Sequence, residues 1–269
     1  MNAPQATAQL QPLLLEQRSG DGVVTLTLNR PAQFNSLSEE MLAALQSAFD
    51  RIGADTAARA IVVAAAGKAF CAGHDLKQMK ANPRQDYYEQ LFADCARLML
   101  TIQRVPQPVI ARVHGIATAA GCQLVATCDL AVAAEGARFG VNGIDVGLFC
   151  SSPSVALARN VGRKQAFEML VTGEFIDAAA ARARGLVNRV VPADQLDAEV
   201  KRLTDAIVAK PAVAIGMGKG LFYRQLEMGV DAAYQLAGQT MACNMIDEVA
   251  QEGVAAFMEK RKPHWPGSR

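Results

Sequence analysis

The chain has 269 residues, of which 51% are hydrophobic and 20% are charged, a balance typical of one sizeable folded domain or of a large domain with a small appendage. Its 27 basic and 26 acidic residues leave a formal net charge of +1, so no long-range field attracts nucleic acid or an anionic membrane, and any anionic ligand needs a local basic cluster. No apolar run reaches the roughly 18–20 residues that a membrane span requires.

The six cysteines and three histidines are scattered along the chain. They form no CxxC pair and no His pattern with metal-ligand spacing, so we expect reduced thiols and no metal site. The opening stretch MNAPQATAQLQPLLLEQ has no basic residue before Arg18, which fits neither a signal peptide nor a transit peptide. We therefore expect a cytosolic, cytoplasmic protein.

The first predicted elements are a strand, a helix and a second strand. Residues 23–29 alternate apolar and polar side chains, which predicts a strand that ends before Arg30. Ser38 precedes acidic residues and apolar ones at helical spacing, so we expect a helix with Ser38 as its N-cap. The uninterrupted apolar run at 60–65 predicts a strand buried on both faces. Residues 67–79 are interpreted as a loop that passes into a helix.

The middle of the chain continues this alternation. Residues 86–103 form a long amphipathic pattern that stops near Pro106, which predicts a helix. Residues 108–117 are predicted to form one short apolar strand, followed by an Ala-Ala-Gly turn and a helix that carries Gln123. Residues 130–140 are predicted to form one further strand. Strands that alternate with helices in this way favour parallel βαβ units.

From about Pro153 the sequence becomes mainly helical. Residues 154–171 and 177–187 are predicted to form helices, and the last part of the chain has helical patterns throughout. We therefore divide the chain into a strand-rich α/β core, residues 1–195, and a helical C-terminal region, residues 196–269.

Five segments resemble, in order, the crotonase, or enoyl-CoA hydratase/isomerase, superfamily. They are LNRPAQFNSLS (28–38), KAFCAGHDLK (68–77), HGIATAAGCQLVATCD (114–129), FEMLVTGEFIDAAAARARGLVNRVV (167–191) and EGVAAFMEKRKP (252–263). The pieces AGHDLK, TAAGCQLVA and VGLFCSSP look similar to one subgroup, the enoyl-CoA hydratase domain-containing protein 3 group. The resemblance implies a spiral of ββα units with a helical C-terminal trimerisation region, assembly as a homotrimer or homohexamer, and a role in fatty acid metabolism. It also implies binding of acyl-CoA, with coenzyme A as part of the substrate and no permanently bound cofactor.

The resemblance also implies a shared chemistry, in which two backbone N–H groups stabilise the enolate-like oxyanion of a thioester. The matching positions here are His74 and Ala120. The N-terminus of the helix that follows would strengthen the second donor. Ala120 stands where the family most often has glycine. Its Cβ leaves less room for the thioester oxygen to approach, but its N–H is still available as a donor.

Hydratases of this family use two glutamates, and the matching positions here hold Gln123 and Gly143. A glutamine can orient water or bind a ligand, but it cannot take up and return a proton at neutral pH. Glycine supplies no side chain. General acid–base catalysis contributes about 10²–10⁴ in rate per group. The sequence therefore predicts that the rate of hydration by the usual two-glutamate mechanism is greatly reduced.

Other side chains near these positions have two interpretations each. Asp145 lies two positions past Gly143. It could be an acid, base or nucleophile at the same site, since residues two apart in a strand project from the same face. It could instead bond nearby backbone N–H groups in a loop. The His74 imidazole could reach the ligand or be structural. Residues 150–152, Cys-Ser-Ser, could supply a nucleophile or could simply pack along the pocket.

Coenzyme A needs local positive charge and a flat apolar slot. The resemblance places its contacts in the loop from Arg30 onward, after Gly73, and in a C-terminal helix, often of a neighbouring subunit. The candidates are Arg30, Phe34, Gly73, Asp75, Lys77, Phe257 and Lys260. Phe257 and Lys260 are three apart and share a helical face. Asp75 could instead cap the helix that follows it, and the C-terminal basic run could be a solvated helix end.

Three functional hypotheses follow. The first is an enzyme that acts on an acyl- or enoyl-CoA, as a lyase, an isomerase or a thioester hydrolase, without the glutamate pair. The second is a weak conventional enoyl-CoA hydratase. The third is a non-catalytic acyl-CoA binder or assembly subunit. The predicted oxyanion turn favours the first two, and Gln123 with Gly143 count against the second. We therefore expect an acyl-CoA-processing member of this superfamily, with no nucleic-acid or membrane partner.

Overall fold

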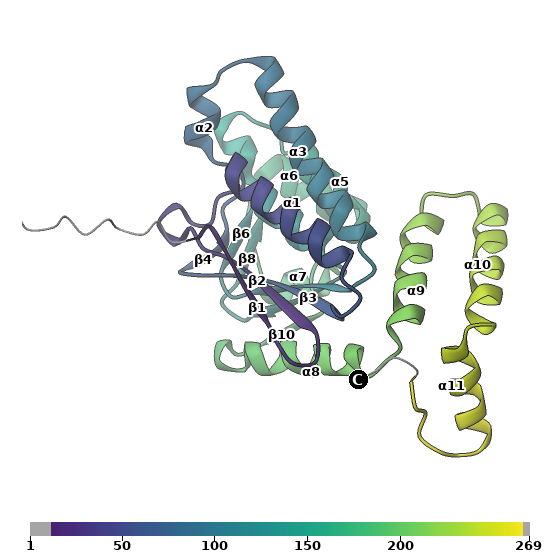
Figure 1. Ribbon diagram of the computed structural model, residues 1–269. Helices are drawn as coiled ribbons and strands as arrows, with labels where there is room; N and C mark the ends of the chain where they lie inside the picture. Colours follow the sequence, from purple (N-terminus) through teal and green to yellow (C-terminus); the bar gives the residue numbers. More distant parts are fainter. Residues whose placement is uncertain (1–11, 266–269) are drawn as a thin grey trace, which may run out of the picture.

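The strands of the described residues form two sheets. The computed structural model describes residues 12–265 (Figure 1). One sheet has six strands in the order β1-β2-β3-β5-β7-β10, and the other has four in the order β4-β6-β8-β9. The strands are β1 (Leu14–Arg18), β2 (Val23–Leu28), β3 (Ala60–Ala65), β4 (Ala69–Cys71), β5 (Val109–Val113), β6 (Ile116–Thr118), β7 (Leu130–Ala134), β8 (Arg138–Gly140), β9 (Ile176–Asp177) and β10 (Arg189–Val191).

Pairing within the sheets is mainly parallel. Strands β2, β3, β5, β7 and β10 run parallel to one another, as do β4, β6 and β8. Only β1 and β9, at the ends of the two sheets, pair antiparallel. The chain passes from the larger sheet to the smaller one three times, at β3–β4, β5–β6 and β7–β8, and each time a helix follows. This repeated ββα unit confirms the predicted α/β crotonase-like class.

The helices cover both sheets and form the end of the chain. Those of the described residues are α1 (Glu39–Gly53), α2 (Leu76–Ala81), α3 (Gln85–Arg104), α4 (Ala120–Thr127), α5 (Ser151–Asn160), α6 (Arg163–Thr172), α7 (Ala178–Ala183), α8 (Leu196–Val208), α9 (Ala212–Gln225), α10 (Val230–Met245) and α11 (Glu248–Met258), with short 3-10 turns η1 (Pro31–Gln33), η2 (Asn142–Val146) and η3 (Ala193–Gln195). Helix α1 begins as predicted, because the Oγ of Ser38 accepts the N–H of Met41 at 3.3 Å.

Two strand predictions were wrong, because residues 108–117 and 130–140 each form two strands that lie in different sheets. The strands of each pair are mostly apolar and buried, and only short breaks separate them, at residues 114–115 and 135–137, so each pair resembles one continuous strand in the sequence. The change of sheet between β5 and β6 occurs at Gly115, where a Cβ would lie 2.3 Å from the carbonyl oxygen of Lys68. Strand β4 also lies in the stretch that was predicted to be a loop.

The core has two parts, one on each face of the larger sheet. The main part packs the sheet against α1, α3 and α4 and contains the fully buried rings of Phe49, Phe70 and Phe139. A smaller part joins the opposite face to α8 through residues that include Val62 and Val200. Strand β3 contributes to both parts, which explains why its whole run is apolar.

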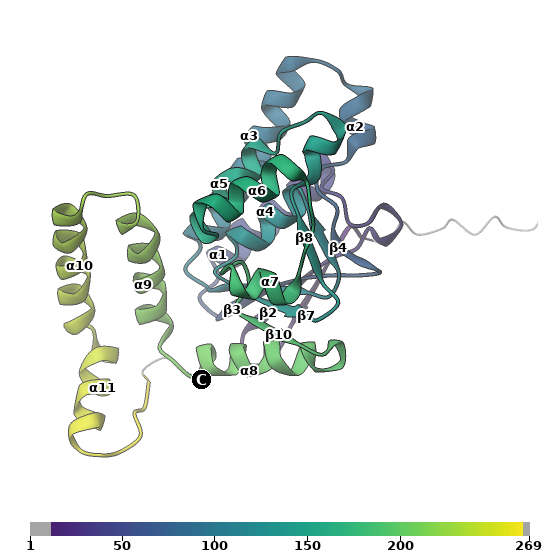
Figure 2. The same ribbon diagram turned by 180° about the vertical axis from the view of Figure 1, so that it is seen from behind.

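From Leu196 onward every described element is a helix. Helix α8 still lies along the sheet, whereas α9, α10 and α11 extend away from it and form what we call the C-terminal arm (Figures 1 and 2). Helix α8 starts directly after residue 195, and because it packs on the larger sheet, the arm begins one helix later, at α9. Among residues 12–265, no helix combines the length and apolar character that crossing a bilayer requires.

Candidate active site

The loop after β4 and the start of α4 touch each other at two glycines. Strands β4 and β6 are parallel neighbours, so the chain leaves both at the same edge of the smaller sheet. Gly73 has a φ of +88°, and a Cβ on it would lie 2.9 Å from the Cβ of Ala119 and 3.2 Å from the amide nitrogen of Ala120. A Cβ on Gly121 would lie 2.1 Å from the carbonyl oxygen of Cys71. Glycine at both positions therefore permits this close approach.

The two predicted oxyanion donors lie at this contact. Leu37 donates its N–H to the oxygen of Gly73 at 2.8 Å and accepts the N–H of Asp75 at 3.4 Å, so His74, between them, turns its own N–H to the other side. Ala120 is the first residue of α4, where an N–H has no partner within the helix. Within residues 12–265, neither of these N–H groups donates a backbone hydrogen bond.

Ala119 is a residue of this site that the sequence analysis missed. It has a φ of +49°, a region that residues with a side chain rarely adopt. Its N–H donates to the oxygen of Gly140 at 3.0 Å, which fixes the turn from β6 into α4. Backbone strain of this kind costs about 1–3 kcal/mol and gathers at functional turns. The signal in the sequence was the run of small residues, which did not indicate the strain.

Gln123 is almost completely buried on α4, with 5% of its surface exposed. Its Oε1 is also buried and has no hydrogen-bond partner among the described residues. Helical side chains lean toward the N-terminus of their helix, so this amide leans toward the Ala119–Ala120 turn. A buried acceptor without a partner costs about 1–3 kcal/mol. The oxygen is therefore suited to accept a hydrogen bond from a ligand or a water molecule.

The His74 ring packs edge-on against Phe92 of α3, with the ring centres 5.5 Å apart and an angle of 65° between the planes. Burial lowers the pKa of His74 below its ordinary value of 6.5, so the imidazole is neutral at pH 7. The side chain is therefore a neutral group in an apolar setting.

Gly143 and Asp145 lie in η2. A Cβ on Gly143 would lie 2.4 Å from the oxygen of Leu148 and 2.8 Å from the Sγ of Cys150, so its side-chain direction is filled. Asp145 is exposed, and a Cβ on Gly173, at the end of α6, would lie 2.7 Å from its Oδ1. The carboxylate of Asp145 therefore faces the C-terminal end of α6.

Arg30 and Asp75 are paired with each other. The Arg30 Nη2 lies 3.2 Å from the Asp75 Oδ2, and both side chains are mostly buried. The other oxygen of Asp75 accepts the N–H groups of Lys77 at 3.1 Å and of Gln78 at 3.4 Å, so Asp75 caps α2. Its negative charge offsets the charge that Arg30 could offer to a phosphate.

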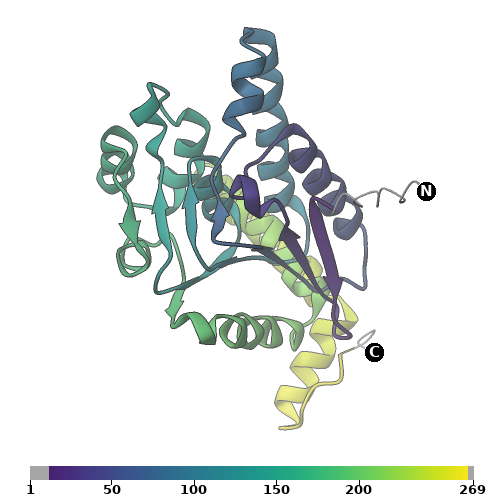
Figure 3. The ribbon, with the colours of Figure 1, turned by 90° about the vertical axis from the view of Figure 1, so that its left-hand side faces the viewer.

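The remaining coenzyme A candidates lie in two separate places. Phe34 is 57% exposed and accepts the N–H of Ala72 through its carbonyl at 3.0 Å, so its backbone lies beside the loop after β4. Lys77 is exposed in the first turn of α2. Phe257, which is 85% exposed, and Lys260 lie at the end of α11, and Figures 1 and 3 place α11 at the opposite end of the molecule from α2. One chain alone does not bring the two groups together.

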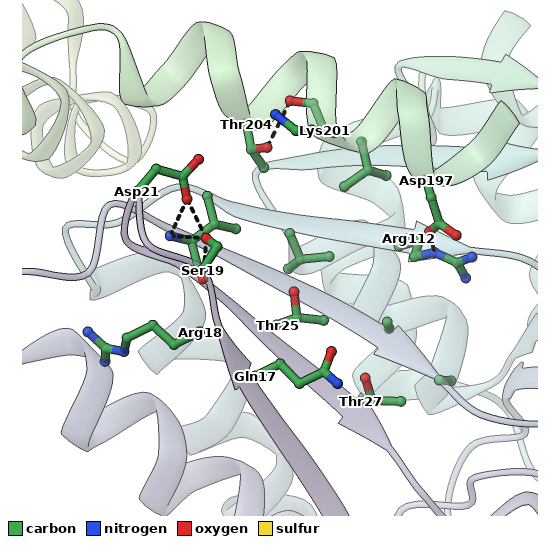
Figure 4. A pocket seen from close by; sticks show the side chains of 15 residues that line it. Gln17, Arg18, Ser19, Asp21, Thr25, Thr27, Arg112, Asp197, Lys201 and Thr204 are labelled. Carbon is green, nitrogen blue, oxygen red and sulfur yellow. Dashed lines mark hydrogen bonds and ion pairs between the residues drawn. The ribbon is translucent and has the colours of Figure 1, made fainter.

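A cavity of about 920 Å³ lies elsewhere, between α8 and the sheet face opposite the main core (Figure 4). Its basic side chains, Arg18, Arg112 and Lys201, are already paired with carboxylates. Arg112 lies 2.5 Å from Asp197, and Lys201 lies 2.7 Å from Asp205. Because Ala120 belongs to the main core on the other face of the sheet, this cavity is separate from the two predicted oxyanion donors.

Relatives of the chain are known by sequence. Enoyl-CoA hydratase domain-containing protein 3 from Mus musculus is 42% identical over 264 residues, which cover 98% of this chain and 88% of the mouse protein. That protein is named as mitochondrial, as are its rat, Xenopus laevis and human counterparts. These relatives contradict the expected cytosolic location. The expectation rested on reduced thiols, which indicate a reducing environment but do not identify the compartment, and on an opening stretch that does not match the pattern of a transit peptide.

Solved structures match over nearly the whole chain. An enoyl-CoA hydratase from Mycobacterium smegmatis has 65% sequence identity and a TM-score of 0.94, covering 95% of this chain and 99% of that one. Human enoyl-CoA hydratase domain-containing protein 3 has 42% identity and a TM-score of 0.91, covering 94% and 100%. The family model for enoyl-CoA hydratase/isomerase matches residues 18–268. The glycine-lined contact between the β4 loop and α4, the spiral of ββα units and these matches lead to one conclusion: the chain belongs to the enoyl-CoA hydratase/isomerase family.

Proposed function

We propose that this protein binds acyl-CoA thioesters and stabilises a negative charge on the thioester oxygen between the N–H groups of His74 and Ala120. The observation that carries the proposal is the close contact at Gly73, beside which both N–H groups lack a backbone partner within residues 12–265. Donors fixed by folded backbone need no reorganisation when charge develops on the oxygen, which makes them effective in catalysis. The names of the similar proteins, which are enoyl-CoA hydratases, support a CoA thioester as the ligand.

The proposed chemistry does not include two-glutamate hydration. Gln123 cannot exchange a proton at neutral pH, and Gly143 has no side chain. The reaction that fits is one in which charge accumulates on the thioester oxygen but no carboxylate pair activates water. Examples are isomerisation, thioester hydrolysis and a lyase reaction other than this hydration. A non-catalytic acyl-CoA binder is the second candidate, and it is favoured by the position of Asp145, whose carboxylate faces α6.

We expect crotonyl-CoA to bind saturably without being hydrated. Loss of one general acid–base group costs about 10²–10⁴ in rate, and both groups are missing here. Isothermal titration calorimetry measures the binding, with free coenzyme A as the control ligand. Loss of the enoyl-thioester absorbance at high protein concentration measures hydration. Robust hydration would contradict this proposal, and absence of any acyl-CoA binding would remove the thioester assignment altogether.

Replacing Asp145 with asparagine is expected to leave acyl-CoA affinity, and any turnover that is found, within roughly twofold, the ratio that corresponds to about 0.5 kcal/mol for a surface substitution. The reason is that its carboxylate is exposed and lies beside Gly173 at the end of α6. Calorimetry and a turnover assay check both quantities. Loss of turnover with retained binding would show instead that Asp145 is catalytic.

We also propose that the chain assembles as a trimer or hexamer through its C-terminal arm. The arm exposes large apolar side chains along both of its last helices: Val230, Tyr234, Met241, Ile246, Phe257 and Met258. Exposed apolar surfaces of this kind mark interaction sites. In such an assembly, Phe257 and Lys260 of one chain would approach coenzyme A bound to another.

A double substitution tests the assembly. Met241→Glu with Ile246→Glu places two charges on the exposed apolar surface, and we expect it to dissociate the oligomer, because buried unpaired charges are costly. Sedimentation velocity gives the mass of the assembly. Gln235→Glu, an exposed position on the same helix, adds a charge beside the patch and is the control. If both proteins keep the wild-type mass, the arm is not the interface.

A further inference from the structure

A buried amide, Asn35, joins the loop between β2 and α1 to the connection between β3 and β4. Its Oδ1 accepts the N–H of Arg30 at 2.9 Å, and its Nδ2 donates to the carbonyl oxygens of Ala66 and Ala69 at 2.8 Å each. The residue is completely buried, so water does not compete for these bonds. Asn35 also has a φ of +55°, a conformation that asparagine tolerates better than most residues with a side chain. It therefore combines a rare backbone conformation with three buried side-chain bonds.

The loop that contains Asn35 is also bonded to the segment that carries His74. Residues 34–37 form three backbone hydrogen bonds with residues 72–75, at 2.8, 3.0 and 3.4 Å. Two of these bonds are made by Leu37 and lie on either side of His74. Because Asn35 stands within the first of the two segments, its side chain fixes the backbone along which His74 is aligned.

Strand β4 depends on these bonds because its own ladder with β6 is short and irregular. The register shifts between Ala69 and Cys71, the first and last residues of β4, and such a shift disrupts the ladder locally. Asn35 holds the carbonyl group of Ala69, and the bonds at residues 72–75 hold the chain just after the strand. Since β6 leads into the helix that begins at Ala120, the position of β4 sets the separation of the two proposed donors.

We propose that Asn35 is a positioning residue, whose three side-chain bonds keep the N–H of His74 at the separation from the N–H of Ala120 that a thioester oxygen requires. Asn35 acts through the backbone of its loop and does not itself touch the ligand. Oxyanion donors are effective because their positions are fixed in advance, and a displacement of about 1 Å costs on the order of 10²-fold in rate. The inference rests on the proposed binding of acyl-CoA.

Two coenzyme A derivatives separate this role from a general effect on folding. Butyryl-CoA presents a carbonyl oxygen to the donors, whereas the thioether S-butyl-CoA has the same chain without that oxygen. Asn35→Gly permits the backbone conformation but removes the three side-chain bonds. We expect this variant to bind butyryl-CoA about tenfold more weakly, the ratio for one hydrogen bond, and to bind S-butyl-CoA as tightly as the wild type. Isothermal titration calorimetry measures both affinities, whose ratio is the thioester preference.

The carbonyl group of the bound ligand gives a spectroscopic signature of the same role. Hydrogen bonds to a carbonyl oxygen weaken its double bond and lower its stretching frequency. Infrared difference spectroscopy of butyryl-CoA at saturating protein should therefore show the carbonyl band at a lower frequency on the wild type than on Asn35→Gly. A band at the same frequency on both proteins would overturn the role of Asn35.

The matched control is Gln107→Ala. Gln107 is also buried, and its Nε2 donates to the carbonyl oxygens of Ile52 at 3.0 Å and of Asp55 at 3.1 Å. The control therefore also removes an amide that bridges two carbonyl groups, but one that lies before β5 and outside the proposed site. It should leave both affinities and the carbonyl band at the wild-type values.

The outcomes distinguish this inference from the proposed function. If the wild type binds butyryl-CoA no more tightly than S-butyl-CoA, the donors do not engage the carbonyl and the proposed function itself fails. If the wild type prefers the thioester and Asn35→Gly keeps that preference, or if Gln107→Ala loses it equally, only the role of Asn35 fails. Should Asn35→Gly not fold, Asn35→Ser decides the question, because its hydroxyl can still donate to one carbonyl. The preference should then fall about threefold, half of the tenfold effect on a free-energy scale, and an unchanged preference would overturn the inference.

Discussion

Replacing Lys219 with methionine is expected to lower the free energy of unfolding by about 3–5 kcal/mol, because removing one partner of a buried ion pair leaves the other charge uncompensated. Lys219 lies on α9 with 7% of its side chain exposed. Its Nζ donates to the Oδ2 of Asp129 at 2.6 Å and to the carbonyl oxygens of Ile102 at 2.8 Å and Gln107 at 2.9 Å. Methionine is also unbranched, and it ends where the ammonium group of lysine begins, so it makes none of these bonds.

The expected effect is large because Asp129 also bonds residues of two other elements. Its carboxylate also accepts the hydroxyl of Tyr223 at 2.7 Å and the N–H of Val109 at 2.6 Å. Asp129 comes directly after α4, Val109 begins β5, and Tyr223 belongs to α9. Burial lowers the pKa of Lys219, and the charge of Asp129 opposes that shift. The cluster therefore fastens the first helix of the C-terminal arm to the end of the helix that carries Ala120.

Urea unfolding at a fixed protein concentration measures this effect, since assembly makes stability depend on concentration. Lys201→Met is the control, because Lys201 forms an exposed i,i+4 pair with Asp205 and its loss should cost no more than about 0.5 kcal/mol. Adding Asp129→Asn to Lys219→Met removes the uncompensated charge and should restore part of the loss. Equal shifts for the two single lysine variants would show that the buried cluster contributes no more than a surface pair.

Replacing Gly73 with alanine is expected to weaken acyl-CoA binding about tenfold or more, the loss that corresponds to roughly one hydrogen bond of about 1.4 kcal/mol. The added Cβ would lie 2.9 Å from the Cβ of Ala119 and 3.2 Å from the amide nitrogen of Ala120. To relieve this contact, the loop that carries His74 must move away from α4. Any turnover that depends on the two N–H groups should fall further, by about 10²–10³, since loss of one oxyanion donor has an effect of that size.

The control for this variant must carry the same backbone strain. Gly185→Ala is suitable, because Gly185 has a φ of +84° against +88° at Gly73 and lies after α7, outside the proposed site. Calorimetry with butyryl-CoA and free coenzyme A compares the two proteins, and circular dichroism confirms that both are folded. If Gly185→Ala weakens acyl-CoA binding as much as Gly73→Ala, general destabilisation explains the loss and the close approach does not.

The sequence alone determined the features that depend on neighbouring residues. The helix cap at Ser38 and the buried strand at 60–65 were predicted correctly, because a cap involves residues within one turn and a buried strand is a continuous apolar run. The ordered motifs identified the family. They also pointed to His74, in the loop after β4, and to Ala120, at the start of α4, two segments that the structure brings into contact.

The tertiary structure decided the features that depend on distant residues. It divided residues 108–117 between two sheets, paired Arg30 with Asp75 across 45 positions, and joined Lys219 to Asp129 across 90 positions. It also closed the turn at Gly143, where a glycine in the sequence showed only a missing side chain and the fold showed that its space is filled. Spacing and propensity describe interactions over a few residues, whereas these contacts exist only once the sheets and helices have packed together.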